Sequence, residues 1–294
     1  MRLALRLFDR EWDNMQVGQA WAAARFQDDR EAARICSSYA NAGAYLLDLR
    51  EHPRDQIRWL EPALAAARLR EDRPEQEIHL GNLGNAYAYL GEPRRAIGFY
   101  EQRLAIAREI GDRRGEGYAL GTIGLAYSDL GEHQRAIEFH DQRLAISREI
   151  GDRRGEGKSL CNLGNAYAAL GEPQRAIEFY ERHLAISREI GDRRGEGTAL
   201  GSLGVAHASL GELQDATDLY EQRLAIAEEI GDRRGAAEDS WNLGQQLAQR
   251  HDLARAADLM QIRVDYERDI GHPDAEKHAA EIEALRVRLA AGDV

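Results

Sequence analysis

Apolar positions along the chain follow a helical spacing, and the whole pattern returns every 40 residues. In one copy, the apolar positions of a first segment are Leu120, Ile123, Ala126, Tyr127 and Leu130. Those of a second segment are Ala136, Ile137, Phe139, Leu144 and Ile146. Such spacing gathers apolar side chains on one side of an α-helix. The pattern therefore predicts two helices in every copy.

The ends of these two helices carry suitable terminating residues. Asp112 can accept backbone N–H bonds at the start of the first helix, and Gly131 suits its C-terminal cap. The second helix is expected to begin near His133, where a sister copy has Pro173, because proline fits a first helical turn. Gly151 is expected to end it.

The repeat is also visible as recurring strings. Gly-Asp-Arg-Arg-Gly begins at Gly111, Gly151, Gly191 and Gly231, which are 40 residues apart. A second motif joins Leu-Gly, an aromatic residue, alanine and a second aromatic residue. It consists of Leu83, Gly84, Tyr87, Ala96 and Tyr100, and again of Leu163, Gly164, Tyr167, Ala176 and Tyr180.

This motif resembles the tetratricopeptide repeat (TPR) family, whose usual unit is 34 residues. The longer unit is most similar to the arrays of Pins-type spindle-orientation adaptors and of bacterial regulatory proteins. The resemblance implies an all-α TPR solenoid, a right-handed superhelix of about six helix-turn-helix repeats with capping helices at both ends. It also implies that a protein or peptide ligand binds along the concave face.

The resemblance is strongest in the middle of the chain, which suggests four segments. Residues 1–30 are expected to form an N-terminal capping segment and 31–72 a divergent repeat, since Pro53 and Ile57 align with Pro93 and Ile97 after a shift of 40 residues. Residues 73–271 would hold five repeats, and 272–294 a capping helix. Solenoids need such ends to remain soluble.

Glycine recurs in the middle of the first helix in five repeats, where it costs about 1 kcal/mol relative to alanine. Because the cost is repeated, we expect a packing reason, namely two helices too close together for a side chain. These glycines are Gly84, Gly124, Gly164, Gly204 and Gly244.

The composition argues against several classes of partner. The net charge of −12 disfavours nucleic acid, whose binding depends on basic surface. No apolar run approaches the ~18 residues of a membrane span. The two cysteines, Cys36 and Cys161, form no disulfide framework. We therefore expect a cytoplasmic protein with no nucleic-acid or membrane partner.

No catalytic or cofactor motif is complete. Gly155 to Ser159 imitates a phosphate-binding loop, but Asp152 stands where that motif needs its first glycine. Among the nine histidines, His133 and His140 share a helix, yet no second pair joins them as a metal set. The sequence therefore predicts a protein with no enzymatic activity, no cofactor and no bound metal.

The N-terminal segment allows two interpretations. The stretches Leu7–Asn14, Ala20–Ala22 and Arg58–Glu61 resemble the junction that follows the ATPase core in bacterial STAND/NB-ARC signal-transduction ATPases. That resemblance implies a ligand-sensing arm associated with an ATPase module. Alternatively, Trp12, Trp21 and Trp59 simply cover the first helix pair.

Positions that vary among otherwise repeated first helices are candidates for ligand contact. In the TPR family, asparagine at the place of Asn85 and Asn165 grips an extended peptide through its amide, and Gly81, Gly121 and Gly201 would let the peptide backbone approach. The candidates are Asn82, Asn85, Tyr89, Tyr118, Thr122, Leu125, Lys158, Asn162, Asn165, Ser202, Val205, Trp241, Asn242 and Gln245.

Paired arginines begin each first helix and form a ladder. Arginine binds carboxylates through two hydrogen bonds, so the ladder favours an acidic peptide. The alternative is that these arginines make ion pairs between repeats, each contributing roughly 0–1 kcal/mol. The pairs are Arg113 and Arg114, Arg153 and Arg154, Arg193 and Arg194, and Arg233 and Arg234.

Overall fold

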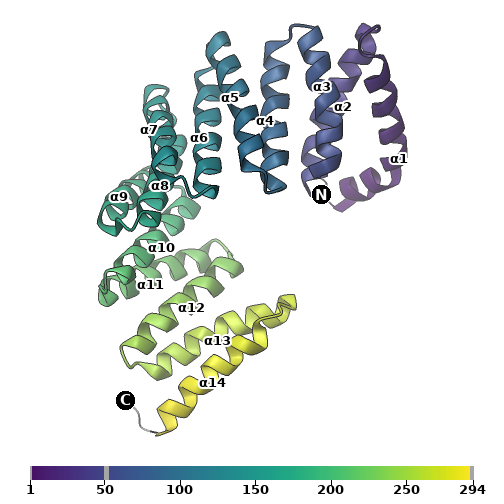
Figure 1. Cartoon of the computed structure of the whole chain (residues 1–294). Coiled ribbons are helices and arrows are strands. Elements are labelled where there is room, and N and C mark those ends of the chain that lie inside the picture. The colour runs from purple at the N-terminus through teal and green to yellow at the C-terminus, as the bar shows by residue number, and fades with distance from the viewer. Residues whose placement is uncertain (1, 50–52, 292–294) are drawn as a thin grey trace. The chain divides into compact units, whose positions relative to one another are not determined.

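In this computed structural model, the backbone is described for residues 2–49 and 53–291, and side chains are described for 10–42 and 53–291. These residues form fourteen α-helices and no strand, which confirms the all-α repeat fold. Contacts divide the chain into two compact units, residues 1–150 and 151–294. Within each unit, successive helices run antiparallel and pack side by side (Figure 1).

The helices of the two units differ little in length. The first unit holds α1 (Arg2–Arg25), α2 (Arg30–Leu49), α3 (Pro53–Leu69), α4 (Arg73–Tyr89), α5 (Pro93–Ile110), α6 (Arg113–Asp129) and α7 (His133–Glu149). The second holds α8 (Arg153–Ala169), α9 (Pro173–Glu189), α10 (Arg193–Ser209), α11 (Leu213–Glu229), α12 (Arg233–Gln249), α13 (Leu253–Ile270) and α14 (Ala275–Ala291). Among the described residues, no helix has the length and apolar character needed to cross a bilayer.

The predicted helix ends are confirmed by their hydrogen bonds. Asp112 precedes α6, and its carboxylate accepts from the Gly115 N–H at 2.9 Å. Gly131 adopts a φ of 74°, which stops the helix and turns the chain. In the divergent copies, Glu71 and His251 take the glycine position with φ angles of 55° and 66°. The turn therefore keeps the same backbone geometry in copies that have no glycine at this position.

The recurring mid-helix glycines are each covered by a side chain from the partner helix. A Cβ added to Gly164 would lie 2.6 Å from Cδ1 of Tyr180. The close approach is thus confirmed, and its cause is mainly a side chain of the second helix, not that helix's backbone. The covering residues, in chain order, are Tyr100, His140, Tyr180, Tyr220 and Met260.

Gly164→Ala is expected to lower the free energy of unfolding by about 1–3 kcal/mol, because the added methyl group forces the Tyr180 ring out of its packing. Gly98 offers a matched control, since it also lies inside a helix but nothing lies within 4 Å of its Cβ position. Gly98→Ala should raise stability by about 0.5–1 kcal/mol. Urea unfolding followed by circular dichroism measures both, and stabilisation by both variants would disprove the packing explanation.

The N-terminal end of the stack is closed by aromatic packing. Trp59 is buried, and Trp12 stacks on it with 5.4 Å between ring centroids. Trp21 instead remains 42% exposed. Two of the three tryptophans therefore form a cap. The side chains of residues 7–9, part of the stretch that resembles the STAND junction, lie outside the described ones.

At the other end, α14 lies within the expected capping segment 272–294, of which residues 292–294 are outside the described range. It packs on α13 in the place that the first helix of a further pair would take. Only Ala275 and Ile282 of α14 are buried. The helix therefore shields the last pair while most of its own residues stay exposed, including Val287 and Leu289.

Candidate peptide-binding face

Each first helix has an exposed side that its partner helix does not cover. In the first unit this side carries Tyr89, Tyr118 and Leu125, which are 68%, 56% and 46% exposed. Asn85 is also exposed, whereas Asn82 and Thr122 are half-buried. Residues three or four positions apart share one side of a helix, so these candidates form an open polar and aromatic surface on α4 and α6.

The second unit presents a comparable surface on α8, α10 and α12. Lys158, Asn165, Val205 and Gln245 are exposed. The remaining candidates of this surface are half-buried, and they are Asn162, Ser202 and Asn242.

Trp241 does not belong to this surface. Only 6% of it is exposed, and its ring lies 4.6 Å from that of His278 on α14. It packs with Met260, Val264 and Ile282 in the core beneath the capping helix. Its place corresponds to Gly81, Gly121 and Gly201 in other copies, so the variation that made it a ligand candidate reflects the end of the stack.

Two asparagines on the exposed surface are held by tyrosines of the second helices. Tyr100 Oη donates to Asn85 Oδ1 at 2.8 Å, and Tyr180 Oη donates to Asn165 Oδ1 at the same distance. The Nδ2 group of neither asparagine has a hydrogen-bond acceptor within the described part of the chain. Each tyrosine therefore fixes its asparagine and leaves two N–H donors free, so the asparagine is prepared to donate more than to accept.

Asn165 lines a pocket formed by α8, α9 and α10. The pocket has a volume of about 520 Å³. Apolar atoms of Ala168, Pro173 and Val205 form much of its wall, while Asn165 and Ser202 supply polar groups. This combination of an apolar hollow and few polar contacts is typical of ligand sites.

The sequence did not reveal the role of the tyrosines, because Tyr100 and Tyr180 also belong to the recurring scaffold motif. The copies also gave only a partial signal for this contact. The copy that has Leu125 in place of asparagine has His140 in place of tyrosine, but the copy that has Val205 there keeps Tyr220. The two positions therefore do not vary strictly together.

The glycines expected to admit a peptide backbone are instead covered by arginines of the second helices. Gly121 is buried, and its Cβ position lies 2.7 Å from Cδ of Arg143. Gly81 lies under Arg103, and Gly201 under Arg223. Glycine at these positions therefore leaves room for an arginine side chain to lie across the first helix. The prediction that a peptide backbone would approach these glycines is wrong.

The first arginine of each ladder pair is part of the scaffold. Arg113 Nε donates to Glu149 Oε1 at 3.0 Å, joining the start of α6 to the end of α7. It also pairs with Glu116, as does Arg108 of the preceding copy. The same arrangement joins Arg153 to Glu189 and Arg193 to Glu229, and a single ion pair joins Arg233 to Asp269.

These ion pairs resemble the second alternative for the ladder, but only some of them join neighbouring repeats. The pair between Arg113 and Glu149 lies within one repeat, whereas the pair between Arg108 and Glu116 joins two repeats. Burial alone would raise the pKa of the Glu116 carboxyl, but hydrogen bonds from both arginines outweigh it and lower the pKa. Glu116 is thus an ionised, shared acceptor in the repeat interface.

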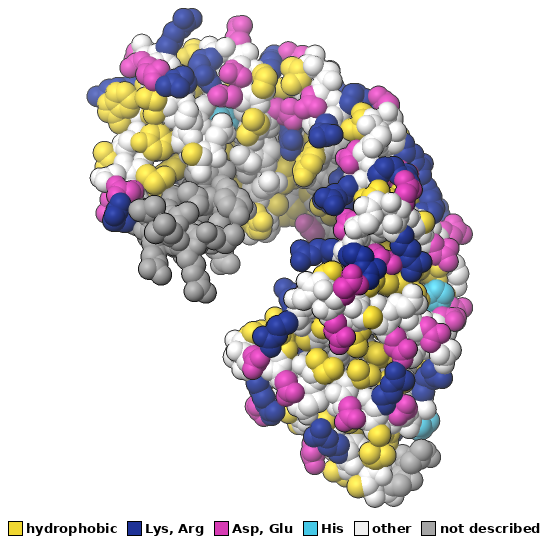
Figure 2. Space-filling view, turned by 180° about the vertical axis from the view of Figure 1, so that it is seen from behind, with side chains coloured by type: hydrophobic (Ala, Val, Ile, Leu, Met, Phe, Trp, Pro, Cys, Tyr) yellow, Lys and Arg dark blue, Asp and Glu magenta, His cyan; other side chains and the backbone are white. Residues whose placement is uncertain are grey.

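The second arginine of each pair is more available. Arg154 lies 3.4 Å from Asp192, and Arg234 lies 2.9 Å from Glu238. Arg114 and Arg194 are exposed and have no ion-pair partner among the residues described. On the face shown in Figure 2, basic and acidic side chains are interspersed. Any acidic preference would therefore rest on single arginines and not on a continuous basic strip.

The string that imitates a phosphate loop lies inside α8, where Lys158 is exposed and Ser159 is buried. Ser159 donates to the Gly155 carbonyl at 2.9 Å, within the helix. Burial raises the pKa of the nearby Cys161 thiol to about 11. Within the helix these backbone N–H groups donate to the oxygens of Asp152 and of preceding helix residues, so they cannot surround a phosphate.

Comparison with known sequences identifies the repeat. Profiles described as tetratricopeptide repeat match residues 80–114, 116–189 and 156–229, which together cover half of the chain. The chain belongs to the tetratricopeptide repeat family. No curated protein sequence matches this TPR chain significantly.

Solved structures resemble the TPR stack as a whole. Aspartyl phosphate phosphatase F from Bacillus subtilis is 16% identical with a TM-score of 0.68, covering 90% of this chain and 73% of that one. A Rap protein complexed with competence and sporulation factor is 16% identical with a TM-score of 0.61, covering 87% and 76%.

A third structure bears on the alternative interpretation of the sequence. It is a signal transduction ATPase with numerous domains (STAND) from Pyrococcus horikoshii that has a TPR sensor. Identity is 19% and the TM-score is 0.69, over 94% of this chain but only 46% of that protein. At these identities, the likeness establishes the fold of the TPR chain and leaves its ligand to be argued from its own residues.

Proposed function

We propose that this TPR chain is a protein-interaction module that binds an extended peptide segment of a partner along the exposed side of its first helices. The observation that carries the proposal is the pair of tyrosine-held asparagines, Asn85 and Asn165. Each presents free N–H donors at a fixed position. Such donors suit the carbonyl oxygens of a peptide backbone, which every sequence offers.

The surroundings of Asn165 support a ligand with a small apolar side chain beside that carbonyl. Val205, Ala168 and Pro173 line the pocket, and burying apolar atoms there contributes roughly 25 cal/mol per Å². Arg194 and Lys158 are exposed on the same two first helices. They favour acidic residues flanking the apolar one, with a modest contribution because exposed charges are screened.

Replacing Asn165 with leucine is expected to weaken peptide binding by roughly 10-fold or more, since a desolvated backbone carbonyl would lose its donor. Leucine is the residue that another copy carries at Leu125, so the fold should tolerate it. Peptides selected from a random library against the intact chain would be measured by fluorescence polarisation, for the wild type, for Asn165→Leu and for Asn85→Leu.

Glu181→Ala provides the control, because Glu181 is exposed on the second helix α9, away from the asparagine side. It should bind the selected peptides as the wild type does. If both leucine variants also retain wild-type affinity while circular dichroism shows intact helices, the asparagines do not contact the ligand. A library that yields no binding peptide would count against an extended-peptide ligand altogether.

A second function is favoured by one structural observation. The STAND protein with a TPR sensor matches over nearly the whole of this chain, and the stretch Arg58–Glu61 resembles the junction in such proteins. We propose as the alternative that the chain is the ligand-sensing arm of an ATPase switch. The native coding region decides this, because it should then encode a P-loop ATPase in the same or an adjacent reading frame.

A further inference from the structure

In three helix pairs, an arginine guanidinium lies at the turn between the two helices. In the pair α4–α5, the Arg95 guanidinium lies 4.2 Å above the Tyr87 ring. Its Nη1 donates to Glu92 at 2.8 Å, and its Nη2 donates to Tyr87 Oη at 3.1 Å. The turn thus has a position where a positive charge lies between an aromatic ring and a carboxylate.

Two further helix pairs repeat this arrangement closely. The guanidinium lies 4.0 and 3.9 Å above the tyrosine ring, and its ion pair with the glutamate measures 2.9 and 2.8 Å. The residues are Tyr127, Glu132 and Arg135, and then Tyr167, Glu172 and Arg175.

The pair α10–α11 has lost this cation and gained metal-ligand side chains in its place. His207 replaces the tyrosine and Asp215 replaces the arginine, while Glu212 remains. Leu219 also replaces the phenylalanine that stacks on the tyrosine in the other three copies. Where the sister turns are neutral overall, this one carries two carboxylates, and no arginine or lysine pairs with either among the described side chains.

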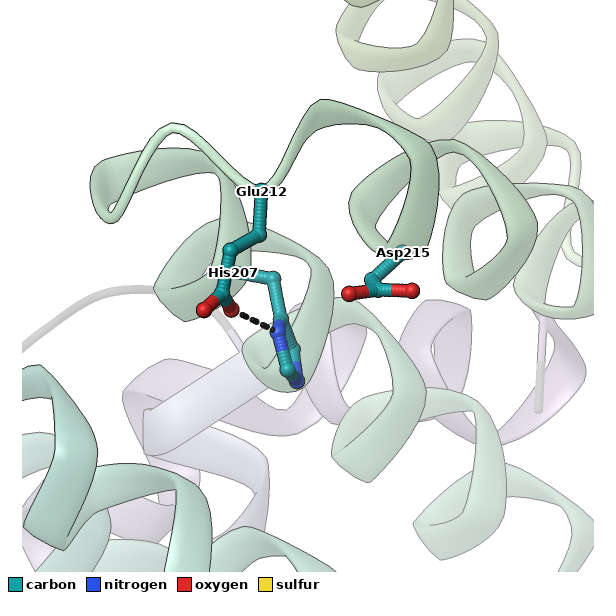
Figure 3. Close-up of side chains that lie close together, drawn as sticks. All are labelled: His207, Glu212 and Asp215. Atoms are coloured by element: carbon teal, nitrogen blue, oxygen red, sulfur yellow. Dashed lines mark hydrogen bonds and ion pairs between the residues drawn. The ribbon is translucent and has the colours of Figure 1, made fainter.

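The three side chains converge (Figure 3). Glu212 Oε2 lies 2.6 Å from His207 Nδ1, and the Asp215 carboxylate points toward the same imidazole. One ligand atom from each residue lies within 4.8 Å of the other two. His207 comes from the last turn of α10, Glu212 from the turn, and Asp215 from the first turn of α11. One helical hairpin therefore supplies all three side chains.

We propose that His207, Glu212 and Asp215 bind a Zn²⁺ ion, which takes the place of the arginine that neutralises the sister turns. One imidazole and two carboxylates form a set that Zn²⁺ accepts, with water as the fourth ligand. Tetrahedral coordination at about 2.0–2.2 Å separates ligand atoms by roughly 3.3 Å, which small side-chain rotations achieve here. Mg²⁺ is disfavoured, because it requires octahedral oxygen ligands.

This ligand set escapes a search for paired histidines or cysteines. Only one histidine contributes, and of its two carboxylate partners Glu212 occupies a position that carries an ordinary ion pair in the sister turns. The informative signal is that His207 and Asp215, whose counterparts contact each other in the sister turns, both depart from the repeat in the same copy.

The test is isothermal titration of the chelator-treated full chain with zinc chloride. The wild type should bind one Zn²⁺ at this site. The matched variant is His207→Tyr combined with Asp215→Arg, which installs the sister pair of residues and so should preserve the fold. Its affinity should be at least about 100-fold weaker, because two of three ligands are gone. Eight of the nine histidines remain in the double variant, so any Zn²⁺ binding by them is measured as background.

Two further measurements separate this site from adventitious binding. Glu212→Gln should weaken Zn²⁺ binding, whereas Glu172→Gln, at the same place in a sister turn, should not. Zinc should also raise the melting temperature of the wild type and not that of the double variant. Equal binding by wild type and double variant, or no binding by the wild type, would overturn the proposal.

Discussion

Trp241→Ala is expected to lower the stability of the C-terminal helices by about 3–5 kcal/mol, the range for removing a large buried aromatic side chain. The indole is 6% exposed and joins Met260 and Val264 of α13 to Ile282 of α14. Because each element of a repeat stack depends on its neighbours, its loss should release α14 first. If the tryptophan served only to contact a ligand, its replacement by alanine would change the free energy of unfolding by no more than about 0.5 kcal/mol.

The measurement is hydrogen exchange of the backbone amides together with urea unfolding. Amides of α13 and α14 should exchange faster in the variant, while those of α8 and α9 should change little. Gln245→Ala is the control, since Gln245 is an exposed residue one helical turn away on α12. Unchanged protection of α14 in the tryptophan variant would show that the capping helix is held by other contacts.

The helices themselves were predictable because their determinants are local and repeated. The aspartate at the start, the glycine at the end and the apolar spacing between them lie within one segment, and each prediction could be checked against sister copies. The tight packing at Gly164 was predictable for the same reason. That the contact is made by a tyrosine ring was not predictable, because the ring comes from a different helix.

The exposed side of the first helices was predictable as a helix side but not residue by residue. Variation among copies correctly pointed to exposed positions such as Asn165 and Val205, yet it also selected Trp241, which varies because the stack ends there. Arg113 recurs because of Glu149, which lies on the next helix. Such pairings depend on how two helices pack, and spacing along one helix does not contain that information.

Departures from the repeat were the most informative feature once positions could be compared in space. The turn at His207 departs at two residues whose counterparts contact each other in the sister turns. The first helix α12 departs at Asp239, where two other copies have Ala119 and Ala199. Unlike the exposed turn, Asp239 is entirely buried. Arg223 Nε lies 2.7 Å from its Oδ1, but the N–H bond does not point at the oxygen, so the contact is an ion pair without a hydrogen bond.

Burial raises the pKa of Asp239 from its ordinary value of 3.8 to about 7, against the opposing effect of Arg223. Between these two values the folded chain keeps a proton on Asp239 that the unfolded chain has lost. The free energy of unfolding therefore falls as pH rises toward 7. From pH 5.5 to pH 8, wild type should lose about 2 kcal/mol relative to Asp239→Ala, since about 1.5 pH units at about 1.4 kcal/mol each lie below the folded pKa.

Urea unfolding of both proteins at the two pH values gives this difference directly, because groups common to both proteins cancel. Alanine is the residue of two sister copies, so the variant should fold and should be the more stable protein at pH 8. Ser240→Ala, at the adjacent buried position, controls for changes in packing and should keep the wild-type pH dependence. If the gap between wild type and Asp239→Ala does not widen as pH rises, Asp239 is ionised in the folded chain throughout, and its ion pair with Arg223 compensates for burial.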